Sequence, residues 1–236
     1  MSRDFATDYS EGFSLMQSIQ TLLERASKTE HGFKDLEKAA VEVCDMVHAT
    51  EAKDLGFTLL QAPLPQARCI GIFILGIVAA QYVDALTALK EQARRDSDWR
   101  VQEIIAKAFD RFCADRGYET ALPVIRTWLA DPSANVRRAV TEGLRIWTRR
   151  PYFRDHPEVA VGLLSQFRNH DSEYLRKSVG NALRDISKRH PELVVRAVAG
   201  WKLDERGTRQ THKLATRLLQ TELRQQGIYD GSDTHQ

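Results

Sequence analysis

Three segments of the chain repeat one another. They begin at Asp98, Ala134 and Glu173 and read "DWRVQEIIAKAFDRF", "ANVRRAVTEGLRIW" and "EYLRKSVGNALRDIS". Aligned without gaps, they place apolar residues in columns four positions apart, which is the spacing of one face of an α-helix. The columns are Val101, Val136 and Leu175; Ile105, Val140 and Val179; and Phe109, Leu144 and Leu183.

The distance between the repeats indicates the architecture. Val136 follows Val101 by 35 residues and Leu175 follows Val136 by 39, which leaves room for a second helix in each repeat. A helix pair of this length cannot bury its apolar face alone and must stack on neighbouring pairs. The sequence therefore predicts an all-α fold, a HEAT-like helical-repeat solenoid (an α-α superhelix) with a concave basic groove.

The composition is that of a globular protein with one substantial core, because 42% of the 236 residues are hydrophobic and 28% are charged. The longest apolar run, 69–80, is well short of the roughly 20 residues needed to span a bilayer. The beginning of the chain, "MSRDFATDYSEGF", is acidic and polar, unlike a signal peptide. We expect a cytoplasmic protein whose three cysteines are reduced.

Helical periodicity runs along almost the whole chain. It predicts helices near 12–27, 33–48, 51–61, 66–81, 83–95, 98–114, 118–130, 133–149, 156–168, 172–189, 191–201 and 208–226. Ser133 and Ser172 supply capping oxygens before two of them. No linker divides the chain, so we expect a single HEAT-like repeat domain over 1–226 and a flexible C-terminal tail over 227–236.

Basic residues gather in the part of the chain that contains the repeat. Residues 1–93 carry 8 Lys and Arg against 13 Asp and Glu, whereas residues 94–236 carry 26 against 19. Arginine grips phosphate with two parallel hydrogen bonds, so clusters of it can hold a nucleic-acid backbone. The alternative is a set of solvated helix faces. The clusters are Arg137, Arg138, Arg145, Arg149 and Arg150, and Arg176, Lys177, Arg184, Lys188 and Arg189.

A polar stripe follows each apolar column on the neighbouring side of the helix. A surface of such stripes suits a polyanion. Alternatively, Glu142 pairs with Arg138 or Arg145 and the stripe is a ladder of exposed ion pairs, each giving about 0–1 kcal/mol. The stripes are Glu103, Lys107 and Asp110; Arg138, Glu142 and Arg145; and Lys177, Asn181 and Arg184.

Two tryptophans, Trp128 and Trp147, fall on apolar faces and are expected in the core. Trp99 differs, because it stands at a helix start four residues before Glu103, which places indole and carboxylate on one face. An indole beside a carboxylate can hold a cationic ring and oppose developing positive charge. Packing is the competing interpretation for Trp99.

Other kinds of site have little support. The seven histidines are dispersed, and no metal-binding motif is present. The chain has no GxGxxG after a strand, no P-loop and no GxSxG. We therefore expect no metal and no cofactor.

At these same positions the chain resembles the AlkC/AlkD superfamily of bacterial DNA glycosylases, HEAT-like proteins that remove alkylated purines. The segment "DSEYLRKSVGNALRDISKRHPELV" (171–194) is similar to the AlkC-type signature, and "NVRRAVTEG" (135–143) is similar to the motif that precedes it. The segment "SDWRVQE" (97–103) resembles the element in which the family places its catalytic acid. The resemblance covers about residues 66–201.

The resemblance implies roles for individual residues. It places the catalytic acid on Glu103, the lesion-facing tryptophan on Trp99 and the AlkD-type phosphate-gripping arginines on Arg138 and Arg184. The AlkC-type acids fall on Glu142 and Asp185. Asn181 stands where AlkD-type enzymes carry a second tryptophan, and "LRIWTRRPYF" after Gly143 lacks an AlkC-type proline pattern, so the subfamily stays open.

The implied activity is hydrolysis of the N-glycosidic bond of purines alkylated at N3 or N7 in duplex DNA. An alkylated purine is cationic and leaves as a neutral base, so the chemistry requires stabilisation of the sugar cation and orientation of water, which a carboxylate can supply. We expect a monomer in the bacterial cytosol with double-stranded DNA as its partner. The alternatives are a catalytically silent scaffold for a protein partner and a reader of distorted DNA.

Overall fold

The computed structural model describes residues 17, 20–26, 28 and 32–219, and within them every regular element is a helix. The predicted all-α fold is therefore confirmed for this part of the chain. The contacts group the chain into two compact units, Met1–Asp115 and Arg116–Gln236. A single domain over 1–226 stays a prediction.

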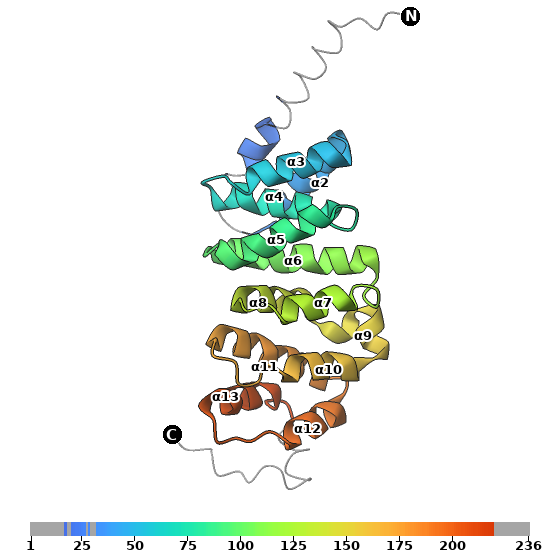
Figure 1. The fold of residues 1–236 in the computed structure, drawn as a ribbon, viewed down its shortest axis with the longest axis vertical. Helices are drawn as coiled ribbons and strands as arrows, with labels where there is room; N and C mark the ends of the chain where they lie inside the picture. The colour runs from blue at the N-terminus through green and yellow to red at the C-terminus, as the bar shows by residue number, and fades with distance from the viewer. Residues whose placement is uncertain (1–16, 18–19, 27, 29–31, 220–236) are drawn as a thin grey trace, which may run out of the picture. The chain divides into compact units, whose positions relative to one another are not determined.

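The first unit is built around its most apolar helix, α4, which packs against α2, α3 and α5 (Figure 1). The apolar run of the sequence lies in this helix, where only a surrounded position keeps so many large side chains from water. The helices are α2 (Lys34–Met46), α3 (Ala49–Leu59), α4 (Pro65–Val78), α5 (Val83–Arg95) and α6 (Trp99–Arg116).

The second unit is built around α11, which packs against α8, α10, α12 and α13 (Figure 1). Contacts to helices beyond the immediate neighbours in sequence are what a stacked repeat requires. The elements are α7 (Leu122–Leu129), α8 (Ala134–Gly143), the 3-10 helix η1 (Trp147–Arg149), α9 (Pro151–Asp155), α10 (Pro157–Ser165), α11 (Glu173–Ser187), α12 (Pro191–Ala199) and α13 (Arg206–Ala215).

The apolar columns form the core of both units. All nine side chains in them have no solvent exposure, and Trp128 and Trp147 are also buried. Cys69 and Cys113 are buried, whereas Cys44 is half-buried. The predicted core positions of the repeat are therefore confirmed.

The prediction of one helix over 133–149 is wrong. α8 ends at Gly143, and the chain continues through η1 into α9, which was not predicted. The indole of Trp147 is fully buried and donates to the carbonyl of Thr141, so this side chain packs back against α8 and does not continue the helix. Pro151 then begins α9, because a first helical position tolerates the missing N–H.

The predicted caps have mixed outcomes. The hydroxyl of Ser172 accepts from the backbone N–H of Leu175, as a cap should. Ser133 makes no such bond with its side chain, and its backbone N–H donates to the carboxylate of Asp131. Half of the predicted helix 12–27, the end of 208–226 and the tail 227–236 lie outside the described residues.

In three helices, an arginine near the start of the helix makes the same pair of hydrogen bonds to the preceding loop. Arg68, Arg176 and Arg209 each stand at the fourth position of their helix. Each guanidinium donates to the two backbone carbonyls six and five residues earlier in the chain. These charge-assisted hydrogen bonds fix the direction in which the loop enters the helix.

We expect Gly180→Ala to destabilise the second unit. A Cβ there would lie 2.6 Å from the Cβ of Leu214 on the adjacent helix, so α11 and α13 would have to separate. Overpacking of this kind costs about 1–3 kcal/mol of the free energy of unfolding, which urea titration measures.

Gly162→Ala is the matched control. Gly162 lies within α10 with open space around its Cα, so alanine there should stabilise the protein by up to about 1 kcal/mol. Equal effects of the two substitutions would contradict the close packing of α11 on α13.

Candidate nucleic-acid interface

Trp99 and Glu103 lie on the first turns of α6, in the first unit. The indole of Trp99 is 62% exposed, and Glu103, one turn further along, is half-buried. The ring of Phe33 meets Trp99 edge-on, with centroids 6.1 Å apart, and the guanidinium of Arg100 lies 6.0 Å from the indole. An exposed aromatic side chain therefore stands one helical turn from a half-buried carboxylate, and their joint role in a site stays a prediction.

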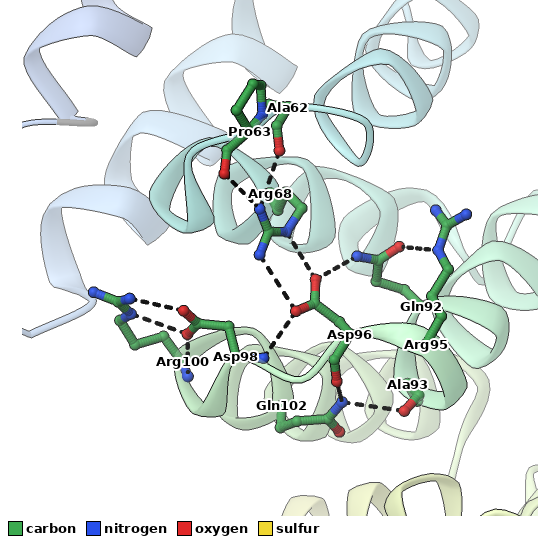
Figure 2. Close-up of polar contacts among 10 residues, drawn as sticks. All are labelled: Ala62, Pro63, Arg68, Gln92, Ala93, Arg95, Asp96, Asp98, Arg100 and Gln102. Atoms are coloured by element: carbon green, nitrogen blue, oxygen red, sulfur yellow. Dashed lines mark hydrogen bonds and ion pairs between the residues drawn. The ribbon is translucent and has the colours of Figure 1, made fainter.

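A buried polar network holds the start of α6 in place (Figure 2). Arg68 of α4 donates through Nε and Nη2 to the two carboxylate oxygens of Asp96, at 2.7 and 3.3 Å. Gln92 donates to the same carboxylate at 2.6 Å, and so does the backbone N–H of Asp98 at 3.0 Å. This carboxylate thereby joins α4, α5 and the loop that leads into α6.

A second set of contacts extends this network into α6 itself. The amide of Gln102 donates to the carbonyls of Ala93 and Asp96, at 3.1 and 2.7 Å (Figure 2). Arg100 donates to the two carboxylate oxygens of Asp98, at 3.0 and 2.7 Å. The hydrogen bond from Arg100 lowers the pKa of Asp98, so this pair is ionised at neutral pH and its charges offset one another.

We expect Asp96→Asn to destabilise the first unit by about 3 kcal/mol, because it leaves the largely buried guanidinium of Arg68 without its ionic partner. Urea unfolding measures the loss. Asp155→Asn is the control, since Asp155 pairs with Arg154 in solvent and should matter by less than about 1 kcal/mol. Similar losses in both variants would mean that the buried pair does not hold α6.

In the second unit, three basic side chains surround the carboxylate of Asp185. Its carboxylate accepts from Arg145 at 2.8 Å and from Lys188 at 3.1 Å, and Arg184 lies 3.6 Å away. Glu142 pairs with Arg145 at 3.4 Å, as the ion-pair interpretation of the stripe predicted. Both predicted acids therefore contact a basic side chain, and their catalytic role stays a prediction.

Arg138 does not lie on the surface. The residue is 6% exposed, and its guanidinium stacks 4.0 Å from the ring centroid of Tyr174, which is 53% exposed. A stacked guanidinium of this kind is held in one orientation. Tyr174 could not be predicted from the sequence, because a single tyrosine in the first turn of a helix carries no signal of its partner on another helix.

Two other predicted phosphate contacts are engaged within the second unit. Arg137 contacts the imidazole of His170 at 2.6 Å and stacks on Phe167, whereas Arg176 donates to Gln210 and to the loop before α11. Burial, and then the charge of Arg137, lowers the pKa of His170, so this imidazole is neutral at neutral pH.

The remaining predicted contacts reach solvent to different degrees. Arg149, Lys177 and Lys188 are exposed, and Asn181 is half-buried. Lys177 pairs with Glu173 at 2.7 Å. The second unit thus brings Arg145, Arg184 and Lys188 together around Asp185. A shared groove for these cations and Trp99 stays a prediction.

The ion pairs of Asp185 should make stability depend on pH. Burial alone would raise the pKa of this carboxyl, but the hydrogen bonds from Arg145 and Lys188 lower it below its ordinary 3.8. The stability that the carboxylate contributes is therefore complete above 3.8 and is lost as the pH falls through the lower folded value.

We expect Asp185→Asn to be less stable than the native chain near pH 7, with a gap that narrows at about pH 3. Urea titrations of both proteins at the two pH values measure this gap. A gap that stays constant would show that the ion pairs around Asp185 do not stabilise the fold.

Among the described residues, no group of three or more His, Cys, Asp and Glu side chains is arranged to hold a metal ion. The helices of this part of the chain include none with the length and apolarity that crossing a bilayer requires.

Comparison with known proteins assigns the chain to a family. The model of the family described as "DNA alkylation repair enzyme" matches residues 33–219. The crystal structure of AlkD2 from Streptococcus mutans is 41% identical, covers 86% of this chain and 98% of its own, and superposes with a TM-score of 0.82. The HEAT-like fold predicted from the repeat is therefore confirmed.

Two further relatives are less similar in sequence. YhaZ of Bacillus subtilis, an uncharacterised protein, is 32% identical over 87 residues, which make up 35% of this chain and 24% of that protein. The alkylpurine DNA glycosylase AlkC of Pseudomonas fluorescens, solved bound to DNA containing an abasic-site analogue, is 21% identical over 87% of this chain and 65% of its own, with a TM-score of 0.48. This likeness is too distant to transfer any residue role.

Proposed function

Because the chain belongs to the DNA alkylation repair enzyme family, we propose that it is a monofunctional DNA glycosylase that releases cationic N3- or N7-alkylated purines from duplex DNA. The observation that supports this proposal is the pairing of an exposed indole, Trp99, with the carboxylate of Glu103 one turn away on α6.

The two side chains have complementary roles in the proposed reaction. The face of an indole attracts a cation, so Trp99 would favour the alkylated purine over the neutral base. Departure of the purine leaves positive charge on the sugar, which the carboxylate of Glu103 would stabilise while it orients the attacking water. No general acid is needed, because the alkylated purine leaves as a neutral molecule.

The cations of the second unit would contribute binding rather than chemistry. Arg145 and Arg184 are fixed by Asp185, so they are ordered before DNA arrives, and Lys188 and Arg149 are exposed. Preorganised cations lose less conformational entropy when they bind a phosphate. Each phosphate that they neutralise releases counterions, so duplex affinity should fall steeply with salt.

One group of observations favours a second candidate, a protein that binds damaged duplexes without excising the base. Asn181 occupies the position where the family resemblance implies a second lesion-facing tryptophan. In addition, Arg138 is buried beneath Tyr174 and Arg176 is tied to a loop, which leaves fewer side chains for the substrate. Such a protein would keep the DNA affinity and lack the reaction.

The test measures release of 7-methylguanine and 3-methyladenine from methylated duplex DNA. We expect the native chain to release them and Glu103→Gln to be at least about a hundredfold slower, equivalent to about 2.7 kcal/mol of transition-state stabilisation, with DNA affinity retained. Glu119→Gln, at an exposed position before α7, is the control and should match the native rate.

Each result separates the candidates. Equal release by the native chain and Glu103→Gln would remove the catalytic role from Glu103. Salt-dependent binding without release in any variant would favour the DNA reader. Absence of both release and salt-dependent duplex binding would refute both candidates and leave a scaffold for a protein partner.

A further inference from the structure

Trp99 has an aromatic neighbour that no sequence pattern indicates. Phe33 is the residue just before α2, and its half-buried ring meets the indole with centroids 6.1 Å apart and planes inclined by 68°. Edge-to-face pairs of this geometry are attractive beyond the area that they bury, by about 0.5–1.5 kcal/mol. The exposed indole therefore has one defined aromatic contact within its own unit.

A second contact brings the same end of α2 alongside α6. Glu37, one turn after Phe33, lies 3.8 Å from Lys107, which stands two turns after Trp99. Phe33 precedes α2, and its carbonyl accepts the backbone N–H of Glu37, so the two residues lie one turn apart at the same end of the helix. Their contacts with Trp99 and Lys107 lie on either side of the turn of α6 that carries Glu103.

We infer that Phe33 is a positioning residue for Trp99 and thereby determines how strongly the chain prefers a planar cationic purine over a neutral one. The inference rests on the proposed function and adds a residue to its site. A surface tryptophan samples several rotamers, and a ligand that stacks on it must select one of them. The contact with Phe33 holds the indole in one orientation before the ligand arrives.

The other groups near the indole are less suited to this role. Arg100 lies 6.0 Å from the indole, but two hydrogen bonds to Asp98 fix its guanidinium, and as a cation it opposes rather than favours a cationic ligand. Phe33 is uncharged and leaves most of the indole open, since Trp99 remains 62% exposed.

The experiment compares two duplexes that differ in one base. One contains a single 7-methylguanine on a 2′-fluorinated sugar, which resists base loss, and the other contains guanine on the same 2′-fluorinated sugar. The ratio of the two dissociation constants gives the preference for the cationic base. We expect Phe33→Leu to lower this preference about fivefold, within the range of an edge-to-face contact, and to leave affinity for the unmodified duplex within about twofold.

Three further variants make the result specific. Phe33→Tyr keeps the aromatic edge and should retain the native preference. Phe57→Leu removes a half-buried phenylalanine of α3 and should have no effect. Phe33→Met serves in place of leucine if Phe33→Leu fails to fold, as judged by circular dichroism, because methionine is also flexible and lacks an aromatic ring.

Trp99→Leu distinguishes the failure of this inference from failure of the proposed site. If Trp99→Leu lowers the preference and Phe33→Leu does not, Phe33 has no positioning role and the proposed site survives. If the native chain shows no preference, or if Trp99→Leu leaves it unchanged, the proposed site is wrong and the inference is overturned with it. Equal weakening of both duplexes by Phe33→Leu would also overturn it, because a merely structural role predicts that result.

Discussion

The ion pair between Arg68 and Asp96 is the contact on which the geometry of the first unit depends. A carboxylate that is taken out of water is stable there only if its oxygens are satisfied, and Asp96 has Arg68, Gln92 and a backbone N–H as partners. Because these partners come from different elements, the network sets where α6 begins. The orientation of the indole and the carboxylate on that helix follows from it.

In the second unit, charged side chains are held in place by a cluster of basic residues around one carboxylate. The side chain of Asp185 is buried, whereas its partners Arg145, Arg184 and Lys188 are more exposed to solvent. Such a cluster keeps a positive excess while it restricts the movement of each cation. Binding surfaces for polyanions benefit from both properties, since ordered cations give up less freedom on contact with phosphate.

The helical period and the repeat spacing were enough to predict the all-α fold and its core. Residues such as Ile105, Val140 and Val179 are fully buried, and the four-residue spacing of apolar positions within each helix already indicates this. The break after Gly143 was missed, since apolar periodicity continues through Trp147 while the chain turns back. At the candidate site, Trp99 and Glu103 could be paired because they are one turn apart. The contact of Tyr174 with Arg138 and that of Phe33 with Trp99 could not be predicted, because they arise only from tertiary packing.

The arginine that ties down the preceding loop recurs in α4, α11 and α13 with the same offsets. Each of these loop junctions therefore has hydrogen bonds of its own, and Arg68 and Arg176 add further bonds to Asp96 and Gln210 of a neighbouring element. It follows that counting arginines overstates the donors open to a ligand, since at each of these junctions Nη1 of one guanidinium already donates to two backbone carbonyls.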